Sequence, residues 1–477
     1  MLLAVTGPAT SRPPSTTSNP RAALRLETAP PRRVHRDWLK DLPEFARISL
    51  IEASPHQPGT AYVAANRYQR ADRAPYVYRT DDYGKSWTKI VGGLPASDFA
   101  RTIREDRSKA GLLYLGTEHG IYVSFDNGGA WQSLRLDLPV TPVHGIVSTE
   151  KDLVIGTHGR SFYILDNAAI LRQFTAGIAT RALHLFDPPD ARRGVDRGVS
   201  VDYYLKADAD KVSIEILDAT GAAVNNFAGV PAKEGEKPAG PPSEEEFFRA
   251  PAARVPVKAG MNRFVWDMRY ANAKDFPNMI LWAGSTRGPL APPGTYQVRL
   301  TAGGVTETQS FSIARNPNTP GISNADLAEQ FALARQIRDR VTQANEAVVR
   351  IRSLKDQIAD RTKQWAATQK DRKLSKAAML GDTLTGKLTA IEGEIYQYRN
   401  RSSQDPLNYP IMLNNKLAAL QGVVEAGDGK PTAQSYAVFK ELSGRLDAEL
   451  AKLDAALKTD LPPFNAEIAK KRLAAVK

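Results

Sequence analysis

Two acidic residues, Asp98 and Glu118, are the strongest candidates for acid–base chemistry in this chain of 477 residues. Hydrolysis of a glycosidic bond needs two carboxyl groups with separated pKa values, roughly 5–10 Å apart. Asp98 and Glu118 would supply such a pair if the fold brought them together. They are two among several acids, so the sequence allows a glycosidase here without defining one.

Basic and imidazole side chains occupy loops close to these acids in the sequence. We expect one face of a β-structure to gather a ligand-binding set from these loops: Arg67, Arg70, Arg101, His119, His144, His158 and Arg160. The set holds three of the six histidines of the chain. Functional side chains tend to lie on loops that a rigid scaffold holds. The alternative interpretation is a polar rim that is only solvated.

The same side chains could serve two further chemistries. Arg47, Arg101 and Arg160 come from three successive repeat units and could clamp a carboxylate, as a sialidase requires, but an F-R-I-P-like start is missing. His119, His144 and His158 could converge on a metal ion, but their spacing matches no ligand motif. Cysteine is absent, and so are the nucleotide, serine-hydrolase and zinc-protease motifs. We therefore predict no metal site and no cofactor.

The elements that position these residues are marked by a repeated turn. The segments T-D-D-Y-G-K-S-W at Thr80–Trp87 and S-F-D-N-G-G-A-W at Ser124–Trp131 start 44 residues apart. An Asp side chain can accept hydrogen bonds from backbone amides just ahead of it, and Gly tolerates the positive φ of such a turn. The Trp then opens the next strand. We expect a structural role for the residues of both turns: Asp82, Gly84, Trp87, Asp126, Gly128 and Trp131.

Three similar units precede residue 178. The strand order in a unit is a, b, c, d, and in the first two units the Asp turn lies between c and d. Periods near 40 residues with several strands indicate propeller blades. We therefore predict a partial β-propeller of about three four-stranded blades over residues 36–178. The third unit ends at Asp166-Asn167 without a Trp, as a terminal blade would. Residues 1–35, rich in Pro, Ser, Thr and Arg, are expected to be disordered.

The repeat is lost after about residue 180. Alternating apolar residues predict an Ig- or fibronectin-like β-sandwich over 179–316, with Trp266 and Trp282 in its core rather than in a sugar-stacking platform. After Pro317, Ser323 and Asp326 form a helix start signal, and apolar residues at three-four spacing come after it. These patterns predict an antiparallel, coiled-coil-like bundle of about four helices over 322–477, so the fold class is mostly β and then α.

Composition limits the partners. The net charge is +12, but basic and acidic residues are interleaved in the helical third, which favours a solvated surface over nucleic-acid binding. No run of 18 apolar residues is present, so no membrane span is expected. The apolar start at Met1–Ala9 has no charged n-region before it, so we predict no signal peptide in this chain.

The repeats resemble a known group. Tyr78–Trp87, Gly116–Trp131 and G-T-H-G-R-S-F-Y-I-L-D at Gly156–Asp166 are similar to the last blades of bacterial Asp-box (BNR-repeat) β-propeller proteins, which are glycosyl-hydrolase-like or sortilin-N-terminal-domain-like. Asn262–Tyr270 and the helical tail are similar to the segments after the propeller in long members. The resemblance implies a closed ring of six to ten blades, and therefore a C-terminal fragment or an arc completed by another chain. It also implies an extracytoplasmic location.

Two functions are compatible with these features. The first is non-catalytic binding or scaffolding, in which the propeller rim holds a glycan or polypeptide and the helices serve assembly. The alternative is a xyloglucanase-like or sialidase-like glycoside hydrolase. The resemblance to xyloglucan-degrading proteins implies catalytic acids that lie partly in earlier blades, which would complement Asp98 and Glu118.

Overall fold

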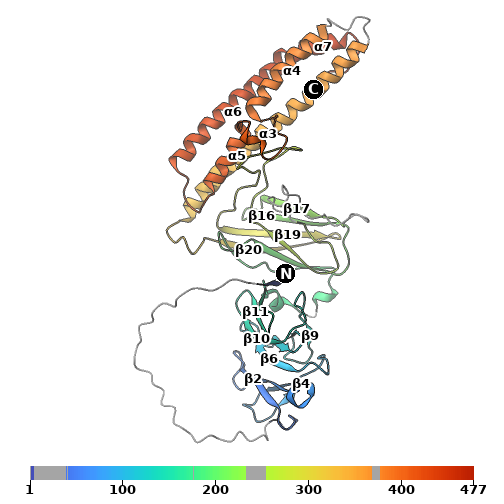
Figure 1. Cartoon of the computed structure of the whole chain (residues 1–477), viewed down its shortest axis with the longest axis vertical. Coiled ribbons are helices and arrows are strands. Elements are labelled where there is room, and N and C mark those ends of the chain that lie inside the picture. The colour runs from blue at the N-terminus through green and yellow to red at the C-terminus, as the bar shows by residue number, and fades with distance from the viewer. Residues whose placement is uncertain (1, 5–38, 40, 176, 232–253, 368–375) are drawn as a thin grey trace. The chain divides into compact units, whose positions relative to one another are not determined.

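The chain divides into two compact units, Met1–Ile178 and Ala179–Lys477. A computed structural model describes residues 2–4, 39, 41–175, 177–231, 254–367 and 376–477. The first unit consists of β-sheets, and the second contains two further sheets and the long helices (Figure 1). The chain is therefore mixed, with β-structure first and helices last.

The first unit contains three four-stranded antiparallel sheets. The first has the order β2 (Arg47–Ala53), β3 (Ala61–Arg67), β4 (Asp72–Thr80) and β5 (Thr88–Lys89). The second has the order β6 (Ala100–Glu105), β7 (Leu113–Thr117), β8 (Ile121–Ser124) and β9 (Gln132–Ser133). The third has the order β10 (Val143–Ser148), β11 (Leu153–Thr157), β12 (Phe162–Leu165) and β1 (Leu2–Ala4). Short helices lie beside the sheets: η2 (Tyr68–Arg70), α1 (Ile170–Gln173) and η3 (Ile178–Thr180).

Strand β1 differs from the sequence prediction. Leu2–Ala4 lies in the segment predicted to be disordered, but it pairs antiparallel with β12. Within the described part of the chain, no Trp-led strand continues the third sheet after β12, and β1 instead pairs with the edge of β12 where such a strand would lie. Residues 5–38, which hold most of the predicted disordered segment, lie outside the described residues.

The first strands of the three sheets lie next to one another. Arg104 on β6 forms an ion pair with Glu52 on β2, and its Nε donates to the carbonyl oxygen of Ile146 on β10 at 3.2 Å. Gly116 on β7 lies so close to β10 that an added Cβ would be 2.6 Å from the carbonyl oxygen of Val143. Side-by-side first strands with meander connections are consistent with part of a β-propeller.

The second unit begins with two sheets that share one buried apolar cluster. A three-stranded antiparallel sheet has the order β13 (Leu183–Leu185), β15 (Val199–Leu205) and β18 (Gly260–Trp266). A five-stranded sheet has the order β14 (Ala191–Arg192), β20 (Val305–Ala314), β19 (Gly294–Ala302), β16 (Val212–Asp218) and β17 (Ala223–Gly229), with β14 parallel to β20. The alternating residues of the sequence pattern, such as Ile214, Trp266 and Val298, are buried in the shared cluster.

The helices form a second apolar core. They are α3 (Asn324–Ala367), α4 (Lys376–Ile395), η4 (Asp405–Leu407), α5 (Leu413–Val424), α6 (Ala433–Thr459) and α7 (Leu461–Ala469). The start signal is confirmed, because the amide of Ser323 donates to Asp326 at 2.9 Å and the amide of Asp326 donates to the Ser323 hydroxyl at 3.1 Å. None of the helices in the described ranges combines the length and apolar character needed to cross a bilayer.

Candidate functional site

One end of the three sheets collects most of the candidate residues. In each sheet the start of the first strand pairs with the end of the second, as Arg47 does with Asn66, Ala100 with Thr117, and Val143 with Thr157. The residues that enter the first strands and the connections after the second strands therefore meet. We call this end the rim: residues 45–47, 66–72, 98–101, 117–120, 142–144 and 157–161.

Asp98 holds His119 at the rim. The Asp98 side chain is 3% exposed, and one of its oxygens accepts from the backbone amide of His119 at 3.1 Å and contacts Nδ1 of the ring at 2.9 Å. Its other oxygen accepts from the hydroxyls of Thr117 at 2.9 Å and Tyr122 at 3.1 Å. The His119 side chain is about half exposed, at 48%. A carboxylate with four contacts orients an imidazole well, but it is poorly placed to reach a substrate.

Glu118 is engaged by Arg101. Nε and one terminal nitrogen of Arg101 donate to the same Glu118 oxygen at 3.0 and 2.7 Å. The guanidinium carbon lies 4.7 Å from the ring centre of Tyr68 and 4.6 Å from that of Phe99, and these two rings are stacked at 5.0 Å. Cation–π contact and the ion pair together fix the Arg101 side chain. The rim therefore presents an ordered ion pair on an aromatic base.

The two remaining histidines lie face to face. The rings of His144, on β10, and His158, after β11, are stacked with centroids 5.1 Å apart and planes 19° from parallel. Burial lowers the pKa of His144, and the charges of Arg101 and His158 lower it further, while Glu118 opposes them and Arg47 adds to the lowering. These charges act on one imidazole, so residues from all three sheets converge here.

The other predicted rim residues are Arg67, which ends β3, Arg70, which ends the short helix η2, and Arg160. Arg67 forms an ion pair of 3.4 Å with Asp72, and Arg70 stacks over the ring of Phe45 with its guanidinium carbon 4.7 Å from the ring centre. Arg160 is exposed on the connection between β11 and β12. Arg67 and Arg70 are therefore bound to neighbours within the first sheet and the residues that enter it.

The Asp turns occupy the connections between third and fourth strands, as predicted. Asp82 accepts from the hydroxyl of Ser86 at 2.6 Å and from its amide at 2.9 Å, and Asp126 accepts from the amide of Ala130 at 2.9 Å. The Ser86 hydroxyl and amide lower the pKa of Asp82 to about 2. Burial acts to raise the pKa of Asp126, but hydrogen bonds from Ser124 and the turn amides lower it overall.

The glycines and tryptophans of these turns are also structural. Gly84 and Gly128 have φ of 81° and 89°. The indole of Trp87 donates to the carbonyl oxygen of Gly84 at 3.2 Å, and the buried indole of Trp131 donates to the carbonyl oxygen of Ile90 at 2.9 Å. Because Ile90 comes directly after β5, the second turn is fastened to the first sheet. These glycines and tryptophans therefore stabilise the turns and the packing of the sheets.

Sequence reasoning missed the aromatic base of the rim. The repeat of Phe45-Ala46-Arg47 as Phe99-Ala100-Arg101 is the available signal, because each phenylalanine has an arginine over its ring.

The prediction for Trp282 is wrong: Trp282 is 39% exposed and lies beyond the two sheets, with its amide and carbonyl bound to the Asn415 side chain of α5. Trp266 is fully buried, as predicted.

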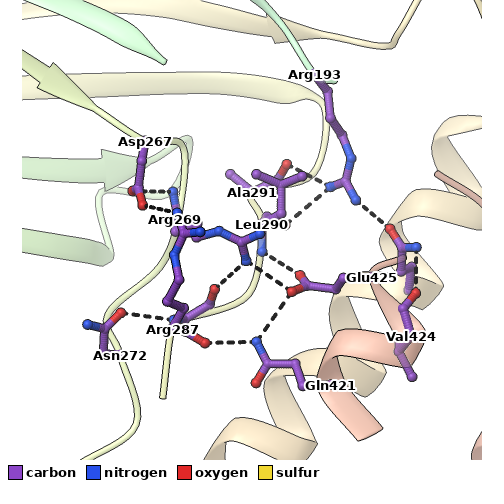
Figure 2. A network of polar contacts seen from close by, with 12 residues as sticks. Arg193, Asp267, Arg269, Asn272, Arg287, Leu290, Ala291, Gln421, Val424 and Glu425 are labelled. Atoms are coloured by element: carbon purple, nitrogen blue, oxygen red, sulfur yellow. Dashed lines mark hydrogen bonds and ion pairs between the residues drawn. The ribbon is translucent and has the colours of Figure 1, made fainter. Parts of the chain in front are cut away.

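A cavity of about 380 Å³ in the second unit is lined by small residues and by the polar residues Arg269, Arg287, Gln421 and Glu425. Arg269 donates to Glu425 at 3.0 Å, the amide of Leu290 donates to Glu425 at 2.7 Å, and Gln421 donates to the carbonyl oxygen of Arg287 at 2.8 Å (Figure 2). These contacts join the sheets to α5 and account for the polarity of the cavity.

Across the described residues, no group of three or more His, Asp or Glu side chains is arranged to hold a metal ion.

No protein-family model and no curated protein matches the chain. Among solved structures, an ancestral GH74 enzyme is 17% identical over 54% of this chain and 42% of that chain, with a TM-score of 0.22. The GH74 xyloglucanase from Xanthomonas campestris is 13% identical over 56% of this chain and 47% of that chain, with a TM-score of 0.21. CopC from Methylosinus trichosporium OB3b is 14% identical over 28% of this chain and 97% of that chain, with a TM-score of 0.15.

The chain thus matches less than half the length of either GH74 enzyme. Likenesses of this size define no activity. Membership of the Asp-box group therefore stays a prediction from the repeats.

Proposed function

We propose that the first unit is a three-blade part of an Asp-box β-propeller whose rim binds a glycan or a polypeptide without chemical turnover. On this proposal the second unit is a β-sandwich and a helical bundle that serves assembly. The proposal is supported by the matched Asp turns and by the gathering of Arg101, Glu118, His119, His144 and His158 at one end of the sheets. An extracytoplasmic location is inferred from the resemblance alone.

The observation that carries the proposal is that other groups of the protein already bind both candidate carboxylates. A glycosidase needs one carboxyl group poised to give a proton and a second poised as base or nucleophile. Asp98 is buried under four contacts, and Glu118 is bound by Arg101. An ordered ion pair beside aromatic and imidazole rings is better suited to recognition than to proton transfer.

Binding can be tested with the full chain on glycan and peptide arrays, and then by calorimetry on any ligand found. Arg101→Met should weaken binding at least fivefold, because the rim then loses the cation that Glu118 and the rings of Tyr68 and Phe99 hold in place. Arg107→Met, at an exposed arginine outside the rim, is the matched control and should bind as the parent does. Failure to bind any array member would remove the proposal.

The glycosidase alternative has its own test. Aryl glycosides and sialosides are incubated with the parent chain and with Glu118→Gln, and the release of the aryl group is measured. We expect no release from either protein. Turnover by the parent that is lost in Glu118→Gln would overturn the non-catalytic proposal and favour the hydrolase.

A further chain that completes the propeller also stays a proposal. It is supported by large apolar side chains on the outermost sheets, where Ile51 of β2 is 62% exposed and Phe162 of β12 is 63% exposed. Sedimentation of the full chain across a concentration series tests it, and a monomer at all concentrations would contradict self-association.

A further inference from the structure

In the free protein, a positive charge on the stacked histidines of the rim is energetically unfavourable. Their ring centroids are 5.1 Å apart, so a positive charge on His158 opposes protonation of His144. The charged groups that act on His144 from the neighbouring elements are Arg47 of β2, Arg101 of β6, Glu118 after β7 and His158 after β11. Two arginines against one glutamate leave this group at +1 when both imidazoles are neutral and at +3 when both are charged.

Glu118, the one carboxylate in this group, is already bound to Arg101. Both hydrogen bonds that Arg101 makes to Glu118 end on the same oxygen, so Glu118 largely offsets Arg101. Burial and the nearby cations keep the pKa of His144 below its ordinary value. A second carboxylate at the rings would supply the missing negative charge and favour the imidazolium forms.

We propose that the His144–His158 pair, with Arg101 and Arg47, is a pH-dependent subsite for the carboxylate of an acidic glycan. This inference rests on the proposed function and names the ligand class for the same rim. When the glycan binds, the imidazoles take protons from solvent while the ligand stays a carboxylate. Binding and protonation are therefore linked, and affinity rises as the pH falls.

The surroundings favour an acidic sugar over an acidic peptide. An aromatic ring lies beside one of these cations: the guanidinium carbon of Arg101 is 4.7 Å from the ring centre of Tyr68, which is partly exposed. A sugar acid offers a carboxylate for the cations and a face of C–H groups for the negative face of the ring. An acidic peptide would need only the cations.

The test is calorimetric titration of the full chain with an oligogalacturonate of defined length at about pH 5 and about pH 7.5, a range in which imidazoles titrate and carboxylates remain ionised. We expect binding to be about tenfold tighter at the lower pH for each imidazole whose pKa the ligand raises by one unit. The methyl ester of the same oligosaccharide is the neutral control and should lose both affinity and pH dependence. A poly-glutamate peptide is the second arm.

The double variant His144→Gln/His158→Gln should bind oligogalacturonate more weakly than the parent at the lower pH, and its affinity should no longer rise as the pH falls. His56→Gln, at a ring that contacts the carbonyl oxygen of Asp106, is the matched control and should keep the rise. Circular dichroism and NMR titration of the imidazole signals verify that each variant is folded and report the histidine pKa values directly.

The outcomes separate this inference from the proposed function. If a neutral glycan binds the rim but oligogalacturonate does not, or if the double variant keeps the pH dependence, the inference is wrong and the rim function stands. If only poly-glutamate binds, the ligand class is wrong. If neither glycans nor peptides bind, both proposals fall together.

Discussion

A residue's chemical type does not fix its role in this rim. Asp98 is a candidate acid in the sequence because carboxylates catalyse glycoside hydrolysis. Its burial and its four contacts make it instead the group that orients His119. Glu118 is likewise bound, by Arg101, but its side chain remains 28% exposed.

Asp98→Asn should therefore lower the stability of the first unit. The amide group replaces an acceptor oxygen with a donor that faces the donors of Thr117 and Tyr122 or of His119, at a cost of about 2–3 kcal/mol. Urea denaturation of the full chain measures the loss. Asp137→Asn, at an exposed aspartate, is the control with little change. Equal stability of the two variants would show that the contacts of Asp98 contribute nothing net.

Asp82 gives a prediction about pH. Its pKa falls from the ordinary 3.8 to about 2 in the folded turn, mainly through the Ser86 hydroxyl. Because the folded-state pKa is the lower one, the turn's contribution to stability is present above about pH 4 and is lost as the pH falls through about 2. Melting temperature measured across this window should fall less steeply in Asp82→Asn than in the parent. An unchanged slope would contradict the assignment.

At the scale of elements, the Asp turns set the geometry of the sheets. The two turns share sequence and hydrogen bonds but not surroundings. A Cβ at Gly84 would meet Trp87 at 3.6 Å, an ordinary contact, whereas a Cβ at Gly128 would lie 2.5 Å from Cδ1 of Ile90. The second turn is packed against the first sheet, and the first turn is free of that constraint.

The surroundings of three glycines predict how their replacement by alanine ranks in its effect on stability. Gly84→Ala should cost about 1–2 kcal/mol through its positive φ alone, and Gly128→Ala should cost more because Ile90 must also move. Gly444→Ala, inside α6 with open space around it, should stabilise by about 0.5–1 kcal/mol. Thermal unfolding of the three variants ranks them. A smaller loss at Gly128 than at Gly84 would mean that the sheets repack freely.

At the scale of the whole molecule, one buried arginine ties the sheets of the second unit to its helices. Arg193, directly after β14, donates to Asp428 at 2.7 Å and to Gln330 of α3. It also donates to the carbonyl oxygen of Ala291 at 3.0 Å (Figure 2). Its side chain is 2% exposed and that of Asp428 is 9% exposed. These contacts make the sheets and helices of Ala179–Lys477 one compact unit.

Arg193→Met should destabilise this unit by about 3–5 kcal/mol, because Asp428 is left buried without its partner. Adding Asp428→Asn should recover part of the loss, since the buried charge is then removed. Arg192→Met, at the exposed neighbour paired with Asp196, should cost less than about 1 kcal/mol. Additive losses in the double variant would show that the two residues are not coupled.

Much of the local structure could be predicted from the sequence. The alternation of Ile214 and Ile216, the Ser323–Asp326 helix start and the two Asp turns are set by neighbours within a few residues, and all are found where the pattern places them. Strand β1 and the position of Trp282 were not predictable in this way. Each depends on a partner far away in the sequence, β12 for one and α5 for the other.

The sequence by itself determined most strands, the turns and the helices of this protein, because short-range hydrogen bonding and apolar spacing decide them. The sequence also predicted that the rim histidines and arginines gather at one face of the β-structure. Only the tertiary structure decided that Glu118 is bound by Arg101, that Asp98 is buried under His119, and that His144 stacks on His158. The reason is physical: burial and charge pairing depend on groups from different strands and sheets, and no local pattern encodes their distances.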